Sequence, residues 1–512
     1  MLAHRVLVLA ALAIFSPACG KRRVQPGAIP PAAPAELTTP EGAQEADDAD
    51  DEDDDDEDVS DDGFGPAPSK ASPATPAASG APPAWAQQAA AKLAAHAKGK
   101  RRAWDRLAEL ADRFGPRPAG SKALEAAIDW SVETMRADGL SAARREKVMV
   151  PNWRRGEESL QVVAPTSREL TVLGLGGTVG TRGTLRAELL VVGSLDELDK
   201  RAAEAKGKIV LVNQKMPPYD HDKDESGYGT AVRPRGEGAS RAAKHGAVGL
   251  LIRSVTAVSL DTPHTGAMRY SDDAPKIPAA AVTVEGAEFL ARSAARGPVK
   301  LAFARGAKTG PDVASANAIA ELRGREKPEE IVVIGGHIDS WDVGDGSSDD
   351  GAGCVMAMEA ALMLRELGLV PRRTIRVVLF TNEEFGLRGG KAYFEAHGKE
   401  PHVAAIESDS GAGAPRGFGV AGDDAAKLAA VKRFAPVFTA LGAGAIDKGW
   451  GGADISPLTE AGVLSLSLRP EGSRYFDVHH SPADTVEKID PDHLQANAAA
   501  FALMAYILAE RE

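Results

Sequence analysis

The chain has almost no cysteine: two residues, Cys19 and Cys354, among 512. A disulfide framework of the kind that holds small secreted domains together is therefore excluded, and the fold must depend on its apolar core. Cys354 lies inside an apolar, helix-like segment, so we expect a small buried side chain there rather than a nucleophile. The length is sufficient for two or three domains, each with a core of its own.

The chain also lacks a basic excess. Its formal net charge is −13, but 15 acidic groups and no basic one fall within residues 41–62, and the other residues sum to +2. A nearly neutral folded part favours neither nucleic acid nor an anionic membrane surface as a partner. Residues 20–86 are rich in Pro, Ala, Asp, Glu and Ser, a composition that buries too little apolar surface to offset its ordering entropy. We interpret this segment as a disordered linker.

The apolar run at the N-terminus is too short to span a bilayer as a mature helix. It covers Val6–Phe15, follows a weakly basic start and precedes the small residues Ser16-Pro17-Ala18 and then Cys19. A cysteine at this place resembles the lipobox of a bacterial lipoprotein. We therefore expect residues 1–19 to be a signal peptide and the exported chain to be anchored by lipid in the bacterial cell envelope. An ordinary cleaved signal, which leaves a periplasmic or secreted protein, is the alternative.

Three patterns follow the linker. Residues 87–154 carry apolar side chains at helical spacing and form the helical start of the main domain, with a break near Gly115. Residues 155–308 alternate short β-rich runs with Gly- and Pro-rich turns, which predicts an inserted β-rich module. Residues 309–512 alternate strand and helix, which predicts an α/β domain in three layers, with helices on both faces of a mostly parallel sheet.

Metal-type residues follow the ends of the strands that we expect in this last part. These strands are Ile331–Ile334, Thr374–Phe380, Val403–Ile406 and Val463–Leu468. After them come, in chain order, His337 and Asp349, the adjacent pair Glu383 and Glu384, then Asp409, then His480. In an open α/β sheet, ligands bind at the carboxyl ends of the strands. Two histidines and several carboxylates suit zinc, which takes imidazole nitrogen and carboxylate oxygen.

The residue types also fit hydrolysis with a pair of metal ions. Such a pair needs one carboxylate between the ions and further ligands at each end, and water bound there loses a proton easily. A carboxylate that does not bind metal must then take this proton and pass it to the leaving amine. Glu383 and Glu384 can divide these roles, because successive side chains point in different directions.

The string from His337 to Gly344, followed by Asp349-Asp350-Gly351, resembles the family of two-zinc aminopeptidases and glutamate carboxypeptidases. The resemblance covers roughly residues 95–510 and includes 154–159, 252–255, 263–266 and 275–278, outside the metal motifs. It implies the zinc-exopeptidase fold, hydrolysis of dipeptides or short peptides, two zinc ions per chain and a homodimer. It also implies that residues 155–308 are a protease-associated (PA) domain that gates substrate or forms the dimer.

The resemblance implies a role for each residue of the centre. His337 and Asp409 would hold one zinc ion, Glu384 and His480 the other, Asp349 would bridge both, Glu383 would be the general base, and Asp339 would accept a hydrogen bond from His337. The Asp349–Asp350 peptide bond is expected to be cis. His480 is preferred to His479 because of its spacing to Asp484. The candidates for substrate contacts are Asp454, Tyr475 and His264.

Two further hypotheses belong to other functional classes. A glutaminyl cyclase-like acyltransferase has a related fold and one zinc ion, so it would not need His337 as a ligand. A non-catalytic surface lipoprotein could bind partners through its PA domain. Such a protein would be expected to have lost ligands or the general base, and none is lost in this sequence.

Overall fold

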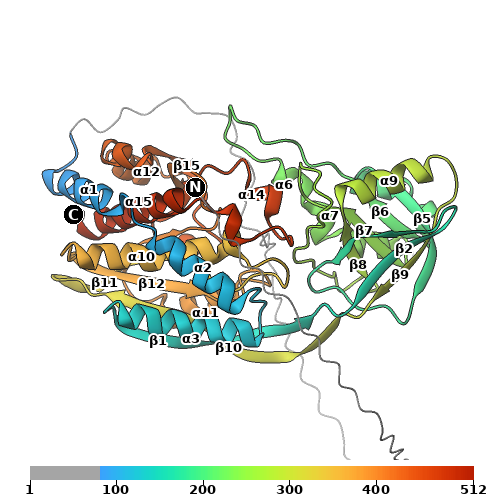
Figure 1. The fold of residues 1–512 in the computed structure, drawn as a ribbon, viewed down its shortest axis with the longest axis horizontal. Helices are drawn as coiled ribbons and strands as arrows, with labels where there is room; N and C mark the ends of the chain where they lie inside the picture. Colours follow the sequence, from blue (N-terminus) through green and yellow to red (C-terminus); the bar gives the residue numbers. More distant parts are fainter. Residues whose placement is uncertain (1–80) are drawn as a thin grey trace, which may run out of the picture. The chain divides into compact units, whose positions relative to one another are not determined.

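The computed structural model describes residues 81–512, which contain two eight-stranded sheets (Figure 1). We call residues 81–154 and 308–512 the first lobe, and residues 155–307 the second lobe. The expected signal peptide, its Cys19 and the linker up to residue 80 lie outside the described residues. The first helix begins at Ala84, so the last residues assigned to the linker belong to it.

The sheet of the first lobe is parallel at its centre and antiparallel towards its edges. In spatial order its strands are β1 (Ser141–Arg154), β10 (Lys308–Leu322), β12 (Arg373–Phe380), β11 (Lys327–His337), β13 (His402–Glu407), β16 (Ser465–Pro470), β14 (Pro415–Ala421) and β15 (Ala445–Gly449). The neighbours β12, β11, β13 and β16 run parallel to one another, and β14 with β15 is a further parallel pair. The expectation of a mostly parallel sheet therefore holds at the centre, and the sheet as a whole is mixed.

Helices cover both faces of this sheet, as the strand–helix alternation predicts. One face packs against α1 (Ala84–Ala97), α2 (Arg102–Phe114), α3 (Lys122–Ala137), α10 (Ala352–Glu366), α12 (Ala425–Lys432), the 3-10 helix η2 (Ala435–Leu441) and α15 (Pro491–Glu510). The other face packs against α11 (Arg388–His397) and α13 (Ser456–Glu460). Figure 1 shows α10 and α15 side by side on the first face, over β11 and β12.

Local sequence explains why these elements form where they do. Every residue of β12 is buried, as expected for a central parallel strand with helices on both faces. The hydroxyl of Ser121 accepts the backbone N–H of Leu124 and caps α3, while Asp490 caps α15 in the same way. Cys354 is buried in α10, as expected from its apolar neighbours.

The second lobe contains a second mixed sheet rather than a purely antiparallel one. In spatial order its strands are β3 (Arg168–Leu170), β2 (Glu158–Ala164), β9 (Lys300–Arg305), β5 (Leu185–Val192), β6 (Ile209–Val212), β7 (Gly249–Arg253), β8 (Ala279–Val282) and β4 (Val172–Gly174). Its helices are α4 (Leu195–Lys200), α5 (Ala202–Ala205), α6 (Tyr228–Ala231), α7 (Arg233–Gly236), α8 (Gly238–Lys244) and α9 (Val284–Ala294). Strands β5 to β8 are parallel, so this module is more α/β in character than the β-rich sequence pattern predicted.

A long antiparallel ladder connects the two lobes. Strand β1 pairs with β10 from Ser141 opposite Glu321 to Arg154 opposite Lys308. The chain leaves the first sheet at one end of this ladder, forms the second lobe and returns at the same end. The second lobe is therefore an insertion whose two connections lie next to each other.

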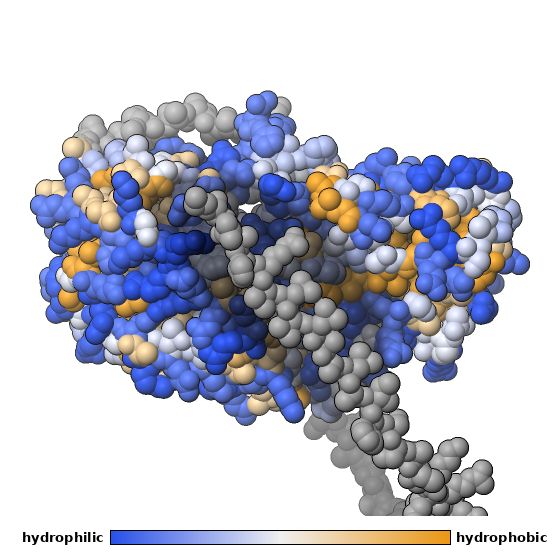
Figure 2. Space-filling model, in the orientation of Figure 1, coloured by the Kyte–Doolittle hydropathy of each residue, from blue (hydrophilic) through white to orange (hydrophobic). Residues whose placement is uncertain are grey.

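The described residues expose few large apolar side chains. On the face that Figure 2 shows, hydrophobic residues are scattered among hydrophilic ones. Across residues 81–512, the large apolar side chains that are exposed are Met149, Leu260 and Val370. No helix within that range combines the length and the apolar content needed to cross a membrane.

Candidate metal centre

The register of the parallel strands brings the predicted ligands to one edge of the first sheet. His337 is the last residue of β11 and lies opposite Phe380, the last residue of β12. Gly335 of β11 pairs with Glu407, the last residue of β13. The segments that follow these strands therefore begin side by side, which places the residues after each strand within reach of His337.

Asp349 reaches this edge from the irregular segment η1 (Ser347–Gly351) between β11 and α10. The Asp349–Asp350 peptide bond is cis, as expected. The carboxylate of Asp350 accepts the backbone N–H of His337 at 3.1 Å and that of Gly353 at 3.0 Å, and so joins the end of β11 to the start of α10. This structural role of Asp350 is not evident from the sequence.

Asp349 lies between two pairs of possible ligands. Its Oδ1 is 3.1 Å from Nε2 of His337, and the same nitrogen is 3.7 Å from Oδ1 of Asp409. Its Oδ2 is 3.2 Å from Nε2 of His480, and that nitrogen is 3.0 Å from Oε2 of Glu384. The structure thus brings all five predicted ligands together, with one oxygen of Asp349 facing each pair.

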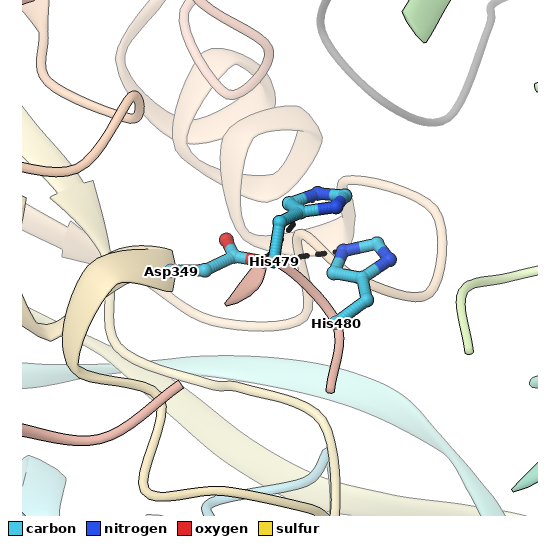
Figure 3. Close-up of side chains that lie close together, drawn as sticks. All are labelled: Asp349, His479 and His480. Carbon is cyan, nitrogen blue, oxygen red and sulfur yellow. Dashed lines mark ion pairs between the residues drawn. The ribbon is translucent and has the colours of Figure 1, made fainter. Parts of the chain in front are cut away.

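Two adjacent histidines approach Asp349 on the same side. Their rings are stacked with centroids 3.6 Å apart, and Figure 3 shows both beside the Asp349 carboxylate. His479 Nε2 lies 3.6 Å from Oδ2 of Asp349, whereas His480 is closer to that oxygen and also contacts Glu384. The backbone of His480 has φ +58°, a conformation that few non-glycine residues adopt. The contacts favour His480, the histidine preferred from sequence, as the ligand.

Asp339 acts on its neighbours in a different way from the one expected. The imidazole Nδ1 of His337 lies 3.0 Å from the backbone carbonyl of Asp339, while the Asp339 carboxylate is 3.7 Å away. That carboxylate instead accepts the backbone N–H of Glu383 at 3.1 Å. A proton on Nδ1 leaves Nε2 of His337 free to bind metal. Asp339 therefore orients the imidazole of His337 as expected, but through its backbone carbonyl and not through its carboxylate.

Asp484 holds the segment that carries Asp349. Its two carboxylate oxygens accept the backbone N–H groups of Ser348 at 2.7 Å and of Asp349 at 3.1 Å. Burial, together with the nearby charge of Asp349, raises the pKa of Asp484 to about 7. In the sequence this residue only marks the spacing from His480, whereas the structure shows that its carboxylate holds the backbone on either side of the Ser348–Asp349 bond.

The electrostatics of the centre are those of crowded, buried carboxylates. Burial raises the pKa of Glu383 well above its usual range, and the negative charges of Asp409 and Glu384 add to that effect. Burial and the charge of Asp349 raise the pKa of Glu384 to about 7. Burial would also raise the pKa of Asp349, but hydrogen bonds from His337 and His480 hold it well below its usual range.

This environment fits a divalent cation. Oε1 of Glu384 and Oδ1 of Asp409 are buried and accept no hydrogen bond from any residue between 81 and 512. A buried carboxylate oxygen without a donor is costly unless a cation lies close to it. Imidazole nitrogens with carboxylate oxygens are the donor set of zinc, so these residues fit the metal that the sequence predicts.

The three candidates for substrate contacts lie around the centre. Asp454 is buried, neither of its carboxylate oxygens has a hydrogen-bond donor within the described part of the chain, and its charge acts on Glu383. Tyr475 begins the short helix α14 (Tyr475–Val478), with its ring 5.1 Å from that of His479. His264 is a buried residue of the second lobe, and burial lowers its pKa to about 4.

The second lobe also contacts the centre through residues that the sequence argument missed. The backbone N–H of Thr265 donates to the carbonyl oxygen of His480 at 2.8 Å. Nη1 of the buried Arg235 lies 3.3 Å from Nδ1 of His480, and the ring of Tyr228 stacks on Phe476 at 4.4 Å. Only the three-dimensional contact identifies these residues, because each is separated from His480 by more than 200 residues.

The first lobe is a three-layer α/β structure with histidines and carboxylates buried past its parallel strands, and an inserted second lobe lies beside them. Together these features define a metallopeptidase. Comparison with known proteins agrees: residues 317–505 match Peptidase family M28, and residues 184–290 match the PA domain. Carboxypeptidase Q of Mus musculus is 42% identical over 424 residues, which cover 82% of this chain and 88% of that protein. Carboxypeptidase Q of Homo sapiens is 41% identical over the same shares. The chain belongs to Peptidase family M28.

Solved structures show the same architecture. The Peptidase M28 precursor from Shewanella amazonensis is 37% identical, with a TM-score of 0.80, over 84% of this chain and 97% of that one. BSAP, a zinc aminopeptidase from Bacillus subtilis, is 22% identical, with a TM-score of 0.61, over 80% of this chain and 95% of that one. The second likeness concerns the fold alone.

Proposed function

We propose that this protein is an exported exopeptidase that hydrolyses dipeptides or short peptides with two zinc ions per chain. The observation that carries the proposal is the position of Asp349, whose two oxygens each face a different His–carboxylate pair. One ion would be held by His337 and Asp409 and the other by Glu384 and His480. When bound, zinc supplies Lewis acidity at the scissile carbonyl and makes water a stronger acid.

Glu383 is the residue that we assign to proton transfer. It is buried, its backbone is fixed by the carboxylate of Asp339, and burial with neighbouring negative charge raises its pKa. A carboxylate with high proton affinity accepts a proton from the attacking water and returns it to the leaving amine. Asp350 and Asp484 keep the surrounding segments in place through backbone hydrogen bonds.

Replacement of the base tests this assignment. Glu383→Gln keeps the shape of the side chain but removes the proton acceptor, so turnover of a dipeptide should fall about 100-fold or more. The metal content should stay equal to that of the wild type, because Glu383 is not among the proposed ligands. A variant with near-normal turnover, or one that has lost its metal, would contradict the assignment.

The same contacts weigh against the one-zinc cyclase hypothesis. His337 is fully buried with Nε2 directed at Asp349 and Asp409, which gives a second ion its ligands. The complete set of ligands and the presence of Glu383 likewise weigh against a protein that only binds partners. Measurement of two zinc ions per chain together with dipeptide hydrolysis would distinguish the proposed exopeptidase from a one-zinc cyclase and from a non-catalytic binding protein.

A further inference from the structure

We propose that an aromatic hollow beside the metal centre receives an uncharged, apolar side chain of the substrate, next to the scissile bond. The inference rests on the proposed exopeptidase function and adds a preference for one class of side chain. The hollow has a volume of about 50 Å³, and its walls include Trp153, Trp341, Phe385, Pro118 and Pro151. These residues come from four separate parts of the chain, so no sequence motif reveals the hollow.

Three aromatic rings form its continuous apolar wall. The centroid of the Phe385 ring lies 5.0 Å from that of Trp341 and 5.7 Å from that of Trp153, within the range of favourable aromatic pairs. Trp153 is fixed further because its indole N–H donates to the carbonyl of Thr178 at 3.0 Å. A wall of rings held by one another keeps its shape when a side chain enters, which reduces the entropic cost of binding.

The hollow lies beside the metal centre, and Trp341 is common to both. Trp341 lines it and also lines the smaller cavity around Asp349, Glu384 and His480. The Trp341 ring lies 5.6 Å from that of His480, and Phe385 follows Glu384 directly in the chain. We therefore place one side chain next to the scissile bond against these aromatic rings when that bond lies at the proposed ligands.

The charged groups around the hollow already have partners. Nε of Arg155 donates to the carboxylate of Asp342 at 2.8 Å, and the Arg155 guanidinium also lies 5.2 Å from the centroid of Trp153. Arg154 donates to the backbone carbonyls of Ala119 and Gly120. A charged substrate side chain would lose its hydration there without gaining a partner, whereas an apolar one gains by burial.

Dipeptides that differ at one position test the inference. The wild type should hydrolyse a leucine-containing dipeptide about tenfold or more faster, in kcat/KM, than its lysine or glutamate counterpart at one of the two positions. Phe385→Ala should reduce the ratio of leucine to alanine at that position by about tenfold. Phe385→Leu should have an intermediate ratio. Phe394→Ala, which removes a half-buried ring of α11 that does not line the hollow, should leave the ratio unchanged.

A binding measurement makes the result independent of turnover. Leucine should change the tryptophan fluorescence of the wild type more than lysine does, and Phe385→Ala should abolish that difference. Equal rates for apolar and charged side chains at both positions, or an equal loss for every substrate in Phe385→Ala, would overturn the inference. If the wild type cleaves no dipeptide, the proposed function fails, and the fluorescence difference alone then decides for or against the hollow.

Discussion

Nε2 of His480 lies 3.0 Å from Oε2 of Glu384. Of the adjacent histidines, His480 is the one that contacts both Glu384 and Asp349. The stacked neighbour, His479, lies 3.6 Å from Asp349. In the proposed two-zinc centre a ligand to the second ion shares that ion with Glu384, so this contact supports His480 for the role. His479 packs between rings instead, at 5.1 Å from Tyr475 and 5.3 Å from Tyr228.

The two histidines should therefore respond differently to substitution. His480→Ala should remove about one metal ion per chain and lower dipeptide hydrolysis by more than about 100-fold, because a ligand matters more than an outer contact. His479→Ala is the matched control and should keep both ions, with activity reduced by less than about tenfold. Metal analysis of the purified variants measures this, and loss of metal from His479→Ala alone would reverse the assignment.

The metal-free protein should become less stable as the pH rises from about 5 to about 8. Burial raises the pKa of Glu384 and Asp484 to about 7 and that of Glu407 to about 8. In the unfolded chain such groups titrate near pH 4. The folded state therefore holds protons that the unfolded state has released, and the free energy of unfolding falls as these carboxyl groups ionise.

Unfolding by urea after treatment with a chelator measures this effect at the two pH values. Zinc should reduce the loss of stability at the higher pH, because a cation compensates the ionised carboxylates and binds the folded state. A chelated protein that is equally stable at both pH values, or more stable at the higher one, would show that the buried carboxylates do not carry the predicted protons.

A glycine of the second lobe should control the aromatic hollow. A Cβ atom added to Gly176 would overlap the Trp341 ring and lie 2.9 Å from Cζ of Phe385. Gly176→Ala should therefore displace these rings, lower stability by about 1–3 kcal/mol and reduce hydrolysis of apolar dipeptides. Gly229→Ala, in the same lobe but with open space around the added Cβ, is the control and should change neither property. Unfolding and dipeptide rates of both variants provide the test.

The candidate ligands could be proposed from the sequence because the ends of the central strands are visible in it. Residues 331–334 and 374–380 are mainly apolar runs, as is typical of buried parallel strands. The residues directly after such runs must lie at the same edge of the sheet, whatever the order of the strands. That is why His337, Glu384 and Asp409 could be expected to lie close together without any knowledge of the packing.

The edges of the sheet and the contacts between lobes could not be predicted in this way. Strand β1 (Ser141–Arg154) carries Arg144, Arg145 and Lys147 in its first half, where no side chain is fully buried, so the apolar pattern of a strand is visible only from Val148 onward. The contact of Arg235 with His480 joins residues 245 positions apart. Such a pair depends on how a folded insertion lies against the sheet, and local propensity contains no information about it.

Zinc content per chain, measured together with dipeptide hydrolysis before and after chelation, shows whether this chain is a two-zinc peptidase. We expect about two zinc ions per chain, loss of hydrolysis when they are removed and recovery when zinc is restored. One ion or none, in a purified and folded protein that cleaves no dipeptide, would contradict it.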